Sequence, residues 1–293
     1  MASSNNTRLG VWLMIATTFV FAVQDGISRH LASEYNVLMV VMIRYWFFAA
    51  FVTTIAYRKA GGIRAAARTE QPLLQIFRGL ILATEICVMI YAFTLLGLIE
   101  SHAVFTSYPL LVAALSGPIL GEVVGWRRWT AIFIGFVGVL IILKPGFGVF
   151  SPAAIVPLAA AFLFALYGLL TRFASRKDTA ATSFFWTGVS GSVMMTAIGF
   201  SYWEPMVQSD WVWMATLCVT GALGHWLLIK TYEAAEASAV QPFAYLQLVF
   251  VSFIGVLVFG ESIELNVAIG AILVVCAGLF TLWRARAKAQ EDA

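Results

Sequence analysis

The apolar stretch SHAVFTSYPLLVAALSGPIL, residues 101–120, is followed directly by Gly121-Glu122 and decides how this chain is organised. A second stretch of the same character, QPFAYLQLVFVSFIGVLVF, residues 241–259, is followed by Gly260-Glu261. The two Gly-Glu pairs lie 139 residues apart, from residue 121 to residue 260. Repetition over such a separation indicates a fold built from two copies of one unit.

A second pair of matching segments supports the duplication. Phe19–Val23, followed by Ser28-Arg29, corresponds to Phe162–Leu166, followed by Thr171-Arg172, 143 residues later. One short match in so apolar a chain is weak support, because Phe, Ala and Leu recur throughout it. Two matches in the same order, at nearly the same separation, favour a duplicated unit over coincidence.

The composition indicates a membrane protein. Of 293 residues, 61% are hydrophobic and 11% are charged, whereas about 25% are charged in soluble proteins. The mean hydropathy is +0.89. A membrane-spanning helix needs about 20 mostly apolar residues, and ten runs of about that length are present: residues 9–31, 37–57, 73–96, 101–120, 128–144, 153–173, 180–200, 210–232, 237–259 and 265–283.

The predicted fold is therefore an all-α integral membrane protein with ten transmembrane helices in two inverted five-helix repeats. The N-terminal half spans residues 1–147 with helices 1–5, and the C-terminal half spans residues 148–293 with helices 6–10. Because five is odd, the second copy enters the membrane from the opposite side. Inverted repeats of this kind place a binding site near the middle of the membrane and permit alternating access.

The distribution of basic residues predicts the orientation, since short cytoplasmic loops carry the excess of Lys and Arg. With both termini cytoplasmic, fourteen basic residues lie inside and two, Arg29 and Lys144, lie outside. The inner set is Arg8, Arg58, Lys59, Arg64, Arg68, Arg127, Arg128, Arg172, Arg176, Lys177, Lys230, Arg284, Arg286 and Lys288. The net charge of +3 reflects this asymmetry and does not indicate a nucleic-acid partner.

Motifs of enzymes, metal sites and cofactor sites are missing from the sequence. A P-loop, an HExxH zinc motif and a GxSxG elbow are absent, which argues against an ATP-driven pump and familiar hydrolases. The three cysteines all fall in spans, which favours packing over a disulfide framework. The three histidines are spread over three spans. We therefore expect no metal, no cofactor and no enzymatic activity.

Ionisable residues within spans are costly in a membrane and are candidates for function. Asp25 lies four residues before Arg29 on one helical face, so a local ion pair near the interface is the favoured interpretation. Arg44 faces either a cavity or a carboxylate of a neighbouring helix. For Glu85 two readings remain open: a proton or cation site, or an ion pair with Arg44 or Arg78.

Several features together resemble the EamA-type members of the drug/metabolite transporter superfamily. They are the ten spans in two halves, Arg78-Gly79 at the start of the third span, and a fourth span with Pro109 that ends at Gly121-Glu122. The resemblance covers residues 9–283 and is greatest to the YddG type of amino-acid exporter in the inner membrane of Gram-negative bacteria. One departure is that Leu248 stands at the position equivalent to Pro109, with the nearest proline at Pro242. The two halves are therefore expected to bend at different depths.

In this family the cavity is formed mainly by spans one, three, four, six, eight and nine. The resemblance implies a substrate-binding wall of polar and aromatic residues, with Pro109, Pro242, Arg44 and Arg78 in structural or gating roles. The wall residues are Gln24, Glu85, Tyr91, His102, Tyr108, Tyr167, His225, Trp226, Tyr245 and Gln247. Aromatic walls with a few polar contacts suit a small amphipathic solute.

The expected function is export of amino acids, aromatic ones among them, and of related small metabolites across the bacterial inner (plasma) membrane. The protein is expected to work by alternating access as a monomer or homodimer. One alternative is a multidrug exporter of apolar cations that uses a membrane carboxylate such as Glu85 or Asp25. Another is an intramembrane enzyme, in which His102 or His225 would act as acid or base.

Overall fold

The computed structural model describes residues 7–58, 62–121, 124–143, 152–234, 240 and 243–291, and these residues form helices and their connections with no strand. The helices are α1 (Thr7–Glu34), α2 (Val37–Arg58), α3 (Gly62–Ala67), α4 (Pro72–Phe105), α5 (Tyr108–Leu120), α6 (Trp126–Leu143), α7 (Pro152–Ala174), α8 (Ala180–Gly199), α9 (Asp210–Ala234), α11 (Leu246–Phe259) and α12 (Leu265–Glu291), with the 3₁₀ turn η1 (Phe200–Tyr202). The all-α membrane fold is confirmed. The proposed boundary between residues 147 and 148 lies outside the described residues.

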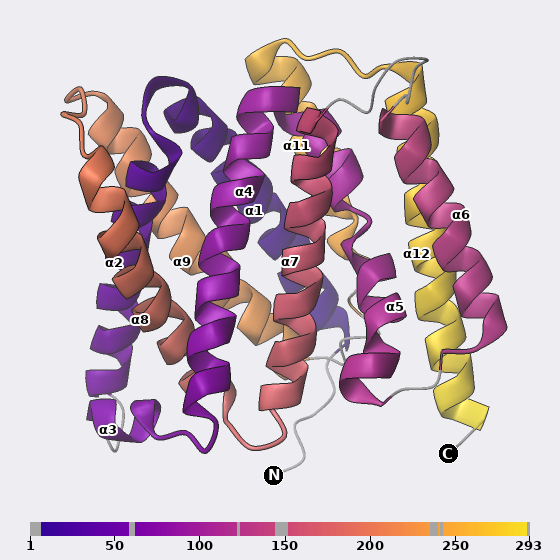
Figure 1. The fold of residues 1–293 in the computed structure, drawn as a ribbon, viewed down its shortest axis with the longest axis horizontal. Coiled ribbons are helices and arrows are strands. Elements are labelled where there is room, and N and C mark those ends of the chain that lie inside the picture. The colour runs from indigo at the N-terminus through magenta and orange to yellow at the C-terminus, as the bar shows by residue number, and fades with distance from the viewer. Residues whose placement is uncertain are drawn as a thin grey trace.

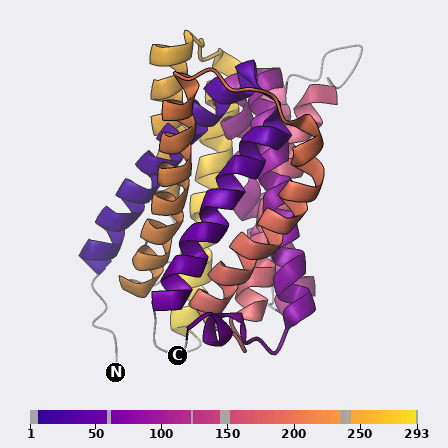
Figure 2. The same cartoon turned by 90° about the vertical axis from the view of Figure 1, so that its left-hand side faces the viewer.

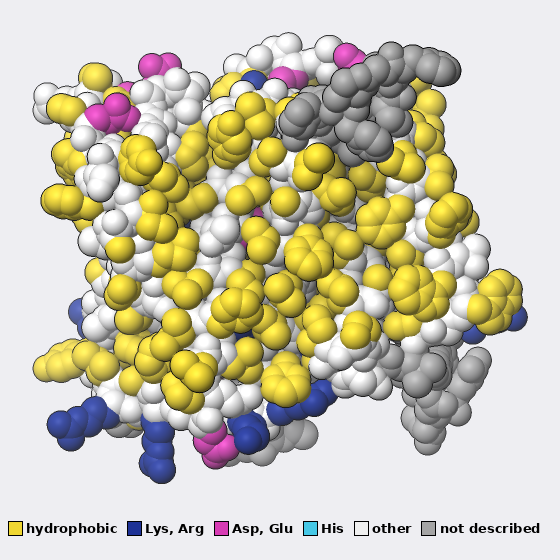
Figure 3. Space-filling view, viewed as in Figure 1, with side chains coloured by type: hydrophobic (Ala, Val, Ile, Leu, Met, Phe, Trp, Pro, Cys, Tyr) yellow, Lys and Arg dark blue, Asp and Glu magenta, His cyan; other side chains and the backbone are white. Residues whose placement is uncertain are grey.

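Five helices of the described part are long and apolar enough to cross a membrane: α1, α2, α4, α7 and α9. Shorter apolar helices, among them α5 and α11, accompany them. The long helices run between the same two edges of the molecule (Figure 1, Figure 2). Hydrophobic side chains cover the surface between these edges (Figure 3), as a protein in contact with lipid requires.

The two edges differ in charge. We call the lower edge in Figure 1 the basic edge, because Arg58, Arg64, Arg172, Arg176 and Lys177 lie on helices or turns that reach it. We call the opposite one the far edge. On the face drawn in Figure 3, most Lys and Arg side chains gather toward the basic edge and most Asp and Glu toward the far edge.

The ends of α5 and α11 show the inversion. Gly121 ends α5 and Gly260 ends α11, and both adopt left-handed backbone conformations, with φ of 79° and 63°. A residue of this conformation commonly closes a helix. In Figure 1, α5 ends toward the basic edge whereas α11 ends toward the far edge. Gly121 and Gly260 therefore terminate equivalent helices that point in opposite directions.

Helix packing follows the same two-fold relation. α4 packs on α7 as α1 packs on α9, and α5 packs on α7 as α1 packs on α11. The pairs α2 with α8 and α6 with α12 each join equivalent helices of the two halves. Most of the extensive contacts thus lie between the halves, and the binding region is built from both.

Small residues permit the closest of these contacts, as expected for membrane helices. A Cβ atom on Gly138 of α6 would lie 2.8 Å from the carbonyl oxygen of Gly270 on α12. The ring of Tyr45 on α2 lies against Gly191 of α8 in the same way. Gly138 and Gly191 therefore allow these helix pairs to approach closely.

The fourth and ninth spans are discontinuous. α4 is kinked at Gly97 and ends at Phe105, and α5 begins at Tyr108 with Pro109 in its first turn. In the second half α11 begins at Leu246, which is 138 residues after Tyr108. The predicted bend of the second half at Pro242 lies outside the described residues, so the expectation that the halves bend at different depths stays a prediction.

Candidate functional site

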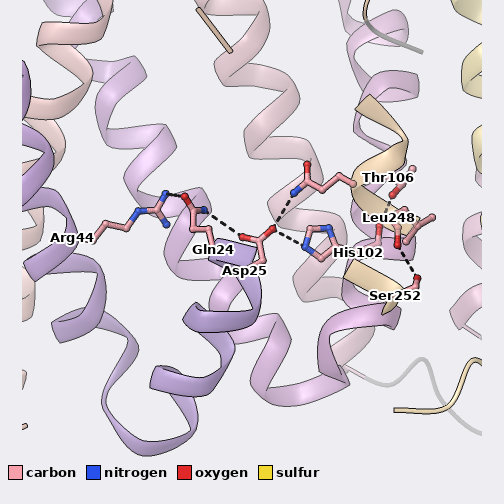
Figure 4. Close-up of polar contacts among 8 residues, drawn as sticks. Gln24, Asp25, Arg44, His102, Thr106, Leu248 and Ser252 are labelled. Atoms are coloured by element: carbon pink, nitrogen blue, oxygen red, sulfur yellow. Dashed lines mark hydrogen bonds and ion pairs between the residues drawn. The ribbon is translucent and has the colours of Figure 1, made fainter. Parts of the chain in front are cut away.

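A chain of polar side chains crosses the middle of the bundle around Asp25 of α1. Oδ2 of Asp25 accepts a hydrogen bond from Nε2 of Gln247 at 3.0 Å and lies 3.1 Å from Nε2 of His102. His102 comes from the last turn of α4, and Gln247 comes from the first turn of α11. Figure 4 shows Asp25 between Gln24 and His102. The carboxylate thus joins helices from both halves.

The chain continues through Gln24 to Arg44 of α2. Nε2 of Gln24 donates to Oδ1 of Asp25 at 3.4 Å, and Nη2 of Arg44 donates to Oε1 of Gln24 at 3.2 Å (Figure 4). A Cβ atom on Gly221 of α9 would lie 3.1 Å from Nε of Arg44. The absence of a side chain at Gly221 therefore leaves room for the guanidinium group.

Aromatic rings border this chain at His102. The ring of Phe93 stacks on the His102 imidazole with centroids 5.4 Å apart, and Phe105 meets it edge-on at 5.9 Å. Phe105, Tyr108 and Phe164 then contact one another at 4.9 to 5.4 Å. Phe164 belongs to α7, so this aromatic group also joins the two halves.

A small cavity lies where the polar chain meets the aromatic group. His102, Tyr108, Tyr245 and Gln247 line it, together with Phe105, Thr106, Pro109, Ala244 and Leu248. Its volume is about 20 Å³, which is enough for about one water molecule, whereas pockets for small organic ligands measure about 300–1,000 Å³. The structure is therefore closed around this site.

A second, smaller cavity lies on the other side of Arg44. Its lining includes Arg44, Tyr45, Cys218 and His225. The His225 imidazole lies parallel to the ring of Phe48 at 5.8 Å. His225 thus borders the Arg44 end of the polar chain, and His102 borders the Asp25 end.

The far edge is closed by Glu261, which follows α11. Its carboxylate accepts the backbone N–H groups of Leu98 at 2.7 Å and Ile99 at 2.9 Å, and it pairs with Arg29. The favoured ion pair between Asp25 and Arg29 is therefore wrong. The reason is that Arg29 also lies over the ring of Phe259, 4.1 Å from its centroid, which draws the guanidinium toward the end of α11.

At the basic edge, the start of α4 is tied to the second half. Arg78 donates to Oγ1 of Thr171 from Nε at 3.0 Å and from Nη2 at 2.8 Å. It also donates to Oε1 of Gln75, whose Nε2 donates to Asp178 at 2.7 Å. An Arg78–Glu85 pair is therefore wrong, because Arg78 is engaged one to two turns nearer the edge.

Asp178, between α7 and α8, is the acceptor of this network. Burial of its carboxyl raises the pKa, but hydrogen bonds from Thr69, Gln75 and the N–H of Glu70 outweigh burial, so that the pKa is lowered. Thr69, Glu70 and Gln75 belong to the first half and Asp178 to the second. The network thus joins the halves at the basic edge as Glu261 joins them at the far edge.

Most of the expected wall residues meet in this region: Gln24, His102, Tyr108, His225, Tyr245 and Gln247 belong to the polar chain or line its cavities. Arg44 and Pro109, expected in structural or gating roles, lie there too. Glu85 is 5% exposed and lies within electrostatic reach of Asp25 and Arg44. Tyr167 lies toward the basic edge, where the Arg78 guanidinium carbon is 5.2 Å from the centroid of its ring.

Two expected residues, Tyr91 and Trp226, are not brought to the site. Tyr91 is 51% exposed and Trp226 is 43% exposed, so their binding roles stay predictions without a supporting contact. Pro242 lies outside the described residues, so its predicted role stays untested. Asp25, Phe105 and Phe164 lie at the site but are not among the predicted wall residues. Asp25 can be recognised in the sequence as a carboxylate next to Gln24 within a span. No sequence signal distinguishes Phe105 and Phe164 from the other phenylalanines of the chain.

Metal binding finds no support in the part of the chain that the structure describes. No group of three or more His, Cys, Asp or Glu side chains lies close enough together there to hold an ion. The polar chain offers one carboxylate, one imidazole and two amides around Asp25. Such a set can bind hydrogen-bonding groups of an organic solute.

Comparison with known proteins gives matches along nearly the whole chain. The model of the EamA-like transporter family matches residues 8–144 and again residues 151–283. A riboflavin transporter of Vibrio cholerae is 27% identical over 99% of both chains. An S-adenosylmethionine uptake transporter of Rickettsia prowazekii is 23% identical over 94% of this chain and 92% of its own.

Two further matches extend this picture. The pseudopaline exporter CntI of Pseudomonas aeruginosa is 24% identical over 92% of this chain and 94% of its own. A solved structure described as "Crystal structure of protein" superposes with a TM-score of 0.65, covering 97% of this chain and all of that one at 16% identity. At that identity the likeness concerns the fold alone. The relatives quoted carry names other than the YddG type, so that finer resemblance stays a prediction.

Proposed function

The chain belongs to the EamA-like transporter family of the drug/metabolite transporter superfamily, and on this premise we propose that it carries a small solute with a planar nitrogen-containing ring and a polar chain. As a member of this family it is a multi-pass membrane transporter of small molecules and not an enzyme. Its relatives include proteins named for uptake and for export, so the direction of transport belongs to the proposal.

One observation carries this choice of solute: the aromatic group of Phe105, Tyr108 and Phe164 adjoins the polar chain of His102 and Asp25. Aromatic side chains bind planar rings well, because offset-stacked and edge-to-face contacts between aromatic rings are favourable. Riboflavin and S-adenosylmethionine, after which two relatives are named, are each a fused nitrogen heterocycle with a polar substituent. A solute of this type would stack on the aromatic group and donate or accept at Gln247 and Asp25.

The proposed mechanism is alternating access between the two halves. The closed cavity, the discontinuous fourth and ninth spans, and the polar contacts at both edges support it. Opening at the far edge would break the Glu261 contacts, and opening at the basic edge would break those of Arg78. Only one edge opens at a time in such a cycle, since the inverted halves rock about the central site.

Amino acids, which the sequence analysis favoured, are the second candidate. The observation in their favour is that Asp25 and Arg44 lie at the two ends of the Gln24 bridge. A carboxylate and a guanidinium so arranged would pair with the ammonium and carboxylate groups of a zwitterion. Export of amino acids, the monomer or homodimer state and the multidrug alternative stay predictions.

The proposed location is the bacterial inner (plasma) membrane with both termini cytoplasmic. The organisms of the quoted relatives are bacteria. The clustering of Lys and Arg at the edge toward which α1 begins and α12 ends supports this orientation (Figure 3).

Purified protein in liposomes provides the test, with radiolabelled riboflavin, S-adenosylmethionine and a panel of amino acids as solutes. The proposal expects riboflavin or S-adenosylmethionine to enter faster than into protein-free liposomes. Tyr108→Ala is expected to slow this uptake, whereas Phe133→Ala, at a ring of α6 that is 71% exposed, is the matched control. Uptake of amino acids alone would favour the second candidate and overturn the first.

A further inference from the structure

We propose that Arg44, Tyr45 and His225 form a subsite for a carboxylate group of the solute, at the second cavity beyond Arg44. The inference rests on the proposed function and narrows the solute class to ring compounds whose polar chain carries an acid group. The ring binds at the aromatic group and the carboxylate at the opposite end of the polar chain. No covalent bond of the solute is made or broken.

Arg44 of α2 is a buried cation with few partners among the described residues. Its side chain is 7% exposed. Nη2 donates to Oε1 of Gln24 at 3.2 Å (Figure 4), and this acceptor is a neutral amide. Because a guanidinium group has five N–H donors, the bond to Gln24 leaves donors for a ligand.

The carboxylates in the middle of the bundle do not neutralise Arg44 by direct contact. Oδ2 of Asp25 lies 3.1 Å from Nε2 of His102. Glu85 precedes Ile86, which lines the cavity, but Glu85 itself is not part of the lining and forms no ion pair with Arg44 in the described structure. An unpaired charge away from water is costly. An anionic group in the cavity would therefore stabilise the guanidinium.

A second donor of the cavity also lacks a partner. Tyr45 lines the same cavity and is 1% exposed, yet its hydroxyl group has no hydrogen-bond partner within the described part of the chain. Buried polar groups in native proteins nearly always have a partner. The ring of Tyr45 is held against α8, where Gly191 leaves room for it. The hydroxyl is therefore a donor that is in place before a ligand arrives.

His225 of α9 completes the donor set. Its imidazole lies parallel to the ring of Phe48 at 5.8 Å and meets Phe21 edge-on at 5.4 Å, so two rings fix its orientation. A neutral imidazole offers one N–H donor. The described lining contains donors and apolar groups but no carboxylate: Arg44, Tyr45, Phe48, Ile86, Cys218, Gly221, Ala222 and His225.

A carboxylate suits this donor set better than a neutral or a cationic group. The planar guanidinium of Arg44 can donate two parallel hydrogen bonds to the two oxygens of a carboxylate, whereas it would repel a cation. The cavity measures about 10 Å³, the room of about one water molecule. It must therefore widen to admit the group, as the cavity at His102 must widen for the ring.

The position of the two cavities determines how the ring and the acid group are joined. Gln24 and Asp25 lie between them and are linked to Arg44 and Gln247 by hydrogen bonds of 3.0 to 3.4 Å. A solute that occupies both cavities must therefore carry its carboxylate on a chain that spans these two residues. S-adenosylmethionine has such a chain, whereas riboflavin has a polar chain without an acid group. The inference favours solutes of the first kind.

A matched pair of solutes tests the subsite on the unaltered protein. Decarboxylated S-adenosylmethionine differs from S-adenosylmethionine only in lacking the carboxylate. In detergent solution S-adenosylmethionine is expected to bind at least tenfold more tightly, because hydrogen bonds between charged groups are lost in its partner. Equal affinities of the two compounds overturn the subsite and leave the proposed transport of ring solutes intact.

Tyr45→Phe tests the donor with the smallest change, since it removes one oxygen atom. It is expected to reduce the preference for S-adenosylmethionine over the decarboxylated compound several-fold, and Arg44→Gln is expected to abolish this preference. The ratio of the two affinities separates a role in recognition from a loss of stability, which would weaken both compounds alike. Tyr57→Phe, at a ring of the same helix that is 77% exposed, is the matched control. A preference retained in full by both variants contradicts the subsite.

A measurement with small probes needs no solute. Formate is the smallest carboxylate, and formamide is its neutral counterpart. At constant ionic strength, formate is expected to raise the melting temperature of the protein above the value in formamide, and Tyr45→Phe is expected to reduce this difference. If neither S-adenosyl compound binds, this result decides. Protection by formate that depends on Tyr45 then supports the subsite and contradicts the proposed solute, whereas no protection, or protection that Tyr45→Phe leaves unchanged, overturns the subsite.

Discussion

Glu261 forms an ion pair with Arg29 and at the same time accepts the backbone N–H groups of Leu98 and Ile99. Arg29 and the α4 residues belong to the first half of the chain, and Glu261 belongs to the second. One carboxylate therefore neutralises a guanidinium of α1 and satisfies the start of the helical segment after Gly97. A carboxylate at a helix N-terminus is favourable because of the helix dipole.

Glu261→Gln is expected to lower the melting temperature of the closed protein in detergent. The free energy of unfolding should fall by about 1.5–3 kcal/mol, the range for hydrogen bonds to charged groups. Glu34→Gln, at an exposed carboxylate of α1, is the control and should change stability little. Equal melting temperatures for the two variants would show that Glu261 does not hold the far edge closed.

Gly97→Ala is expected to destabilise the same edge for two separate reasons. Gly97 has φ of 78°, and a Cβ atom there would lie 2.6 Å from Oε1 of Glu261. Gly62→Ala is the comparison without a clash, because Gly62 has φ of 64° with nothing within 4 Å of the added atom. Gly97 has ψ of 179°, a backbone region that is essentially restricted to glycine and costs other residues about 1–3 kcal/mol, so Gly97→Ala should lose more stability than Gly62→Ala. Similar losses in thermal melts would contradict the clash.

Asp178 predicts a pH dependence of stability. Its pKa is lower in the folded protein than the value of about 3.9 in an unfolded chain. The charged carboxylate therefore stabilises the fold at pH values above about 4, and this stabilisation is lost as the pH falls through the folded pKa. Asp178→Asn is expected to be less stable than the wild type at neutral pH, with a difference that shrinks in acid. A difference that is constant with pH would refute this assignment.

The repeat, the inversion and several of the polar side chains that meet in the middle of the bundle could be predicted from the sequence, because each depends on local patterns. The number of apolar runs sets the topology, and the Gly-Glu pairs mark equivalent helix ends. Gln24, His102 and Gln247 stand out as polar residues in apolar spans. These signals can be read without knowing which helices contact one another.

Partner choice could not be predicted in this way. Arg29 and Asp25 share one helical face, yet each bonds to residues far away in the chain: Arg29 to Glu261, and Asp25 to His102 and Gln247. Tyr91 is an aromatic residue in the same helix as His102, but it faces outward. Such choices depend on how the two halves are rotated relative to each other. The spacing of residues along one helix carries no information about that rotation.

Gly221 offers a test of the polar chain that leaves its members unaltered. A Cβ atom at this position would lie 3.1 Å from Nε of Arg44 and 3.3 Å from Oε1 of Gln24. These distances are short enough that the Arg44–Gln24 contact must shift. Gly221→Ala is therefore expected to weaken solute binding or transport several-fold, and Gly221→Val is expected to weaken it further.

Gly168→Ala is the matched control, because nothing lies within 4 Å of a Cβ atom added there on α7. Both Ala variants gain about 1 kcal/mol of helix propensity over glycine, so neither is expected to unfold. The difference in liposome uptake between the two variants then measures the effect of displacing Arg44. If both variants transport as the wild type does, the position of Arg44 does not govern the solute site, and the polar chain ends at Gln24.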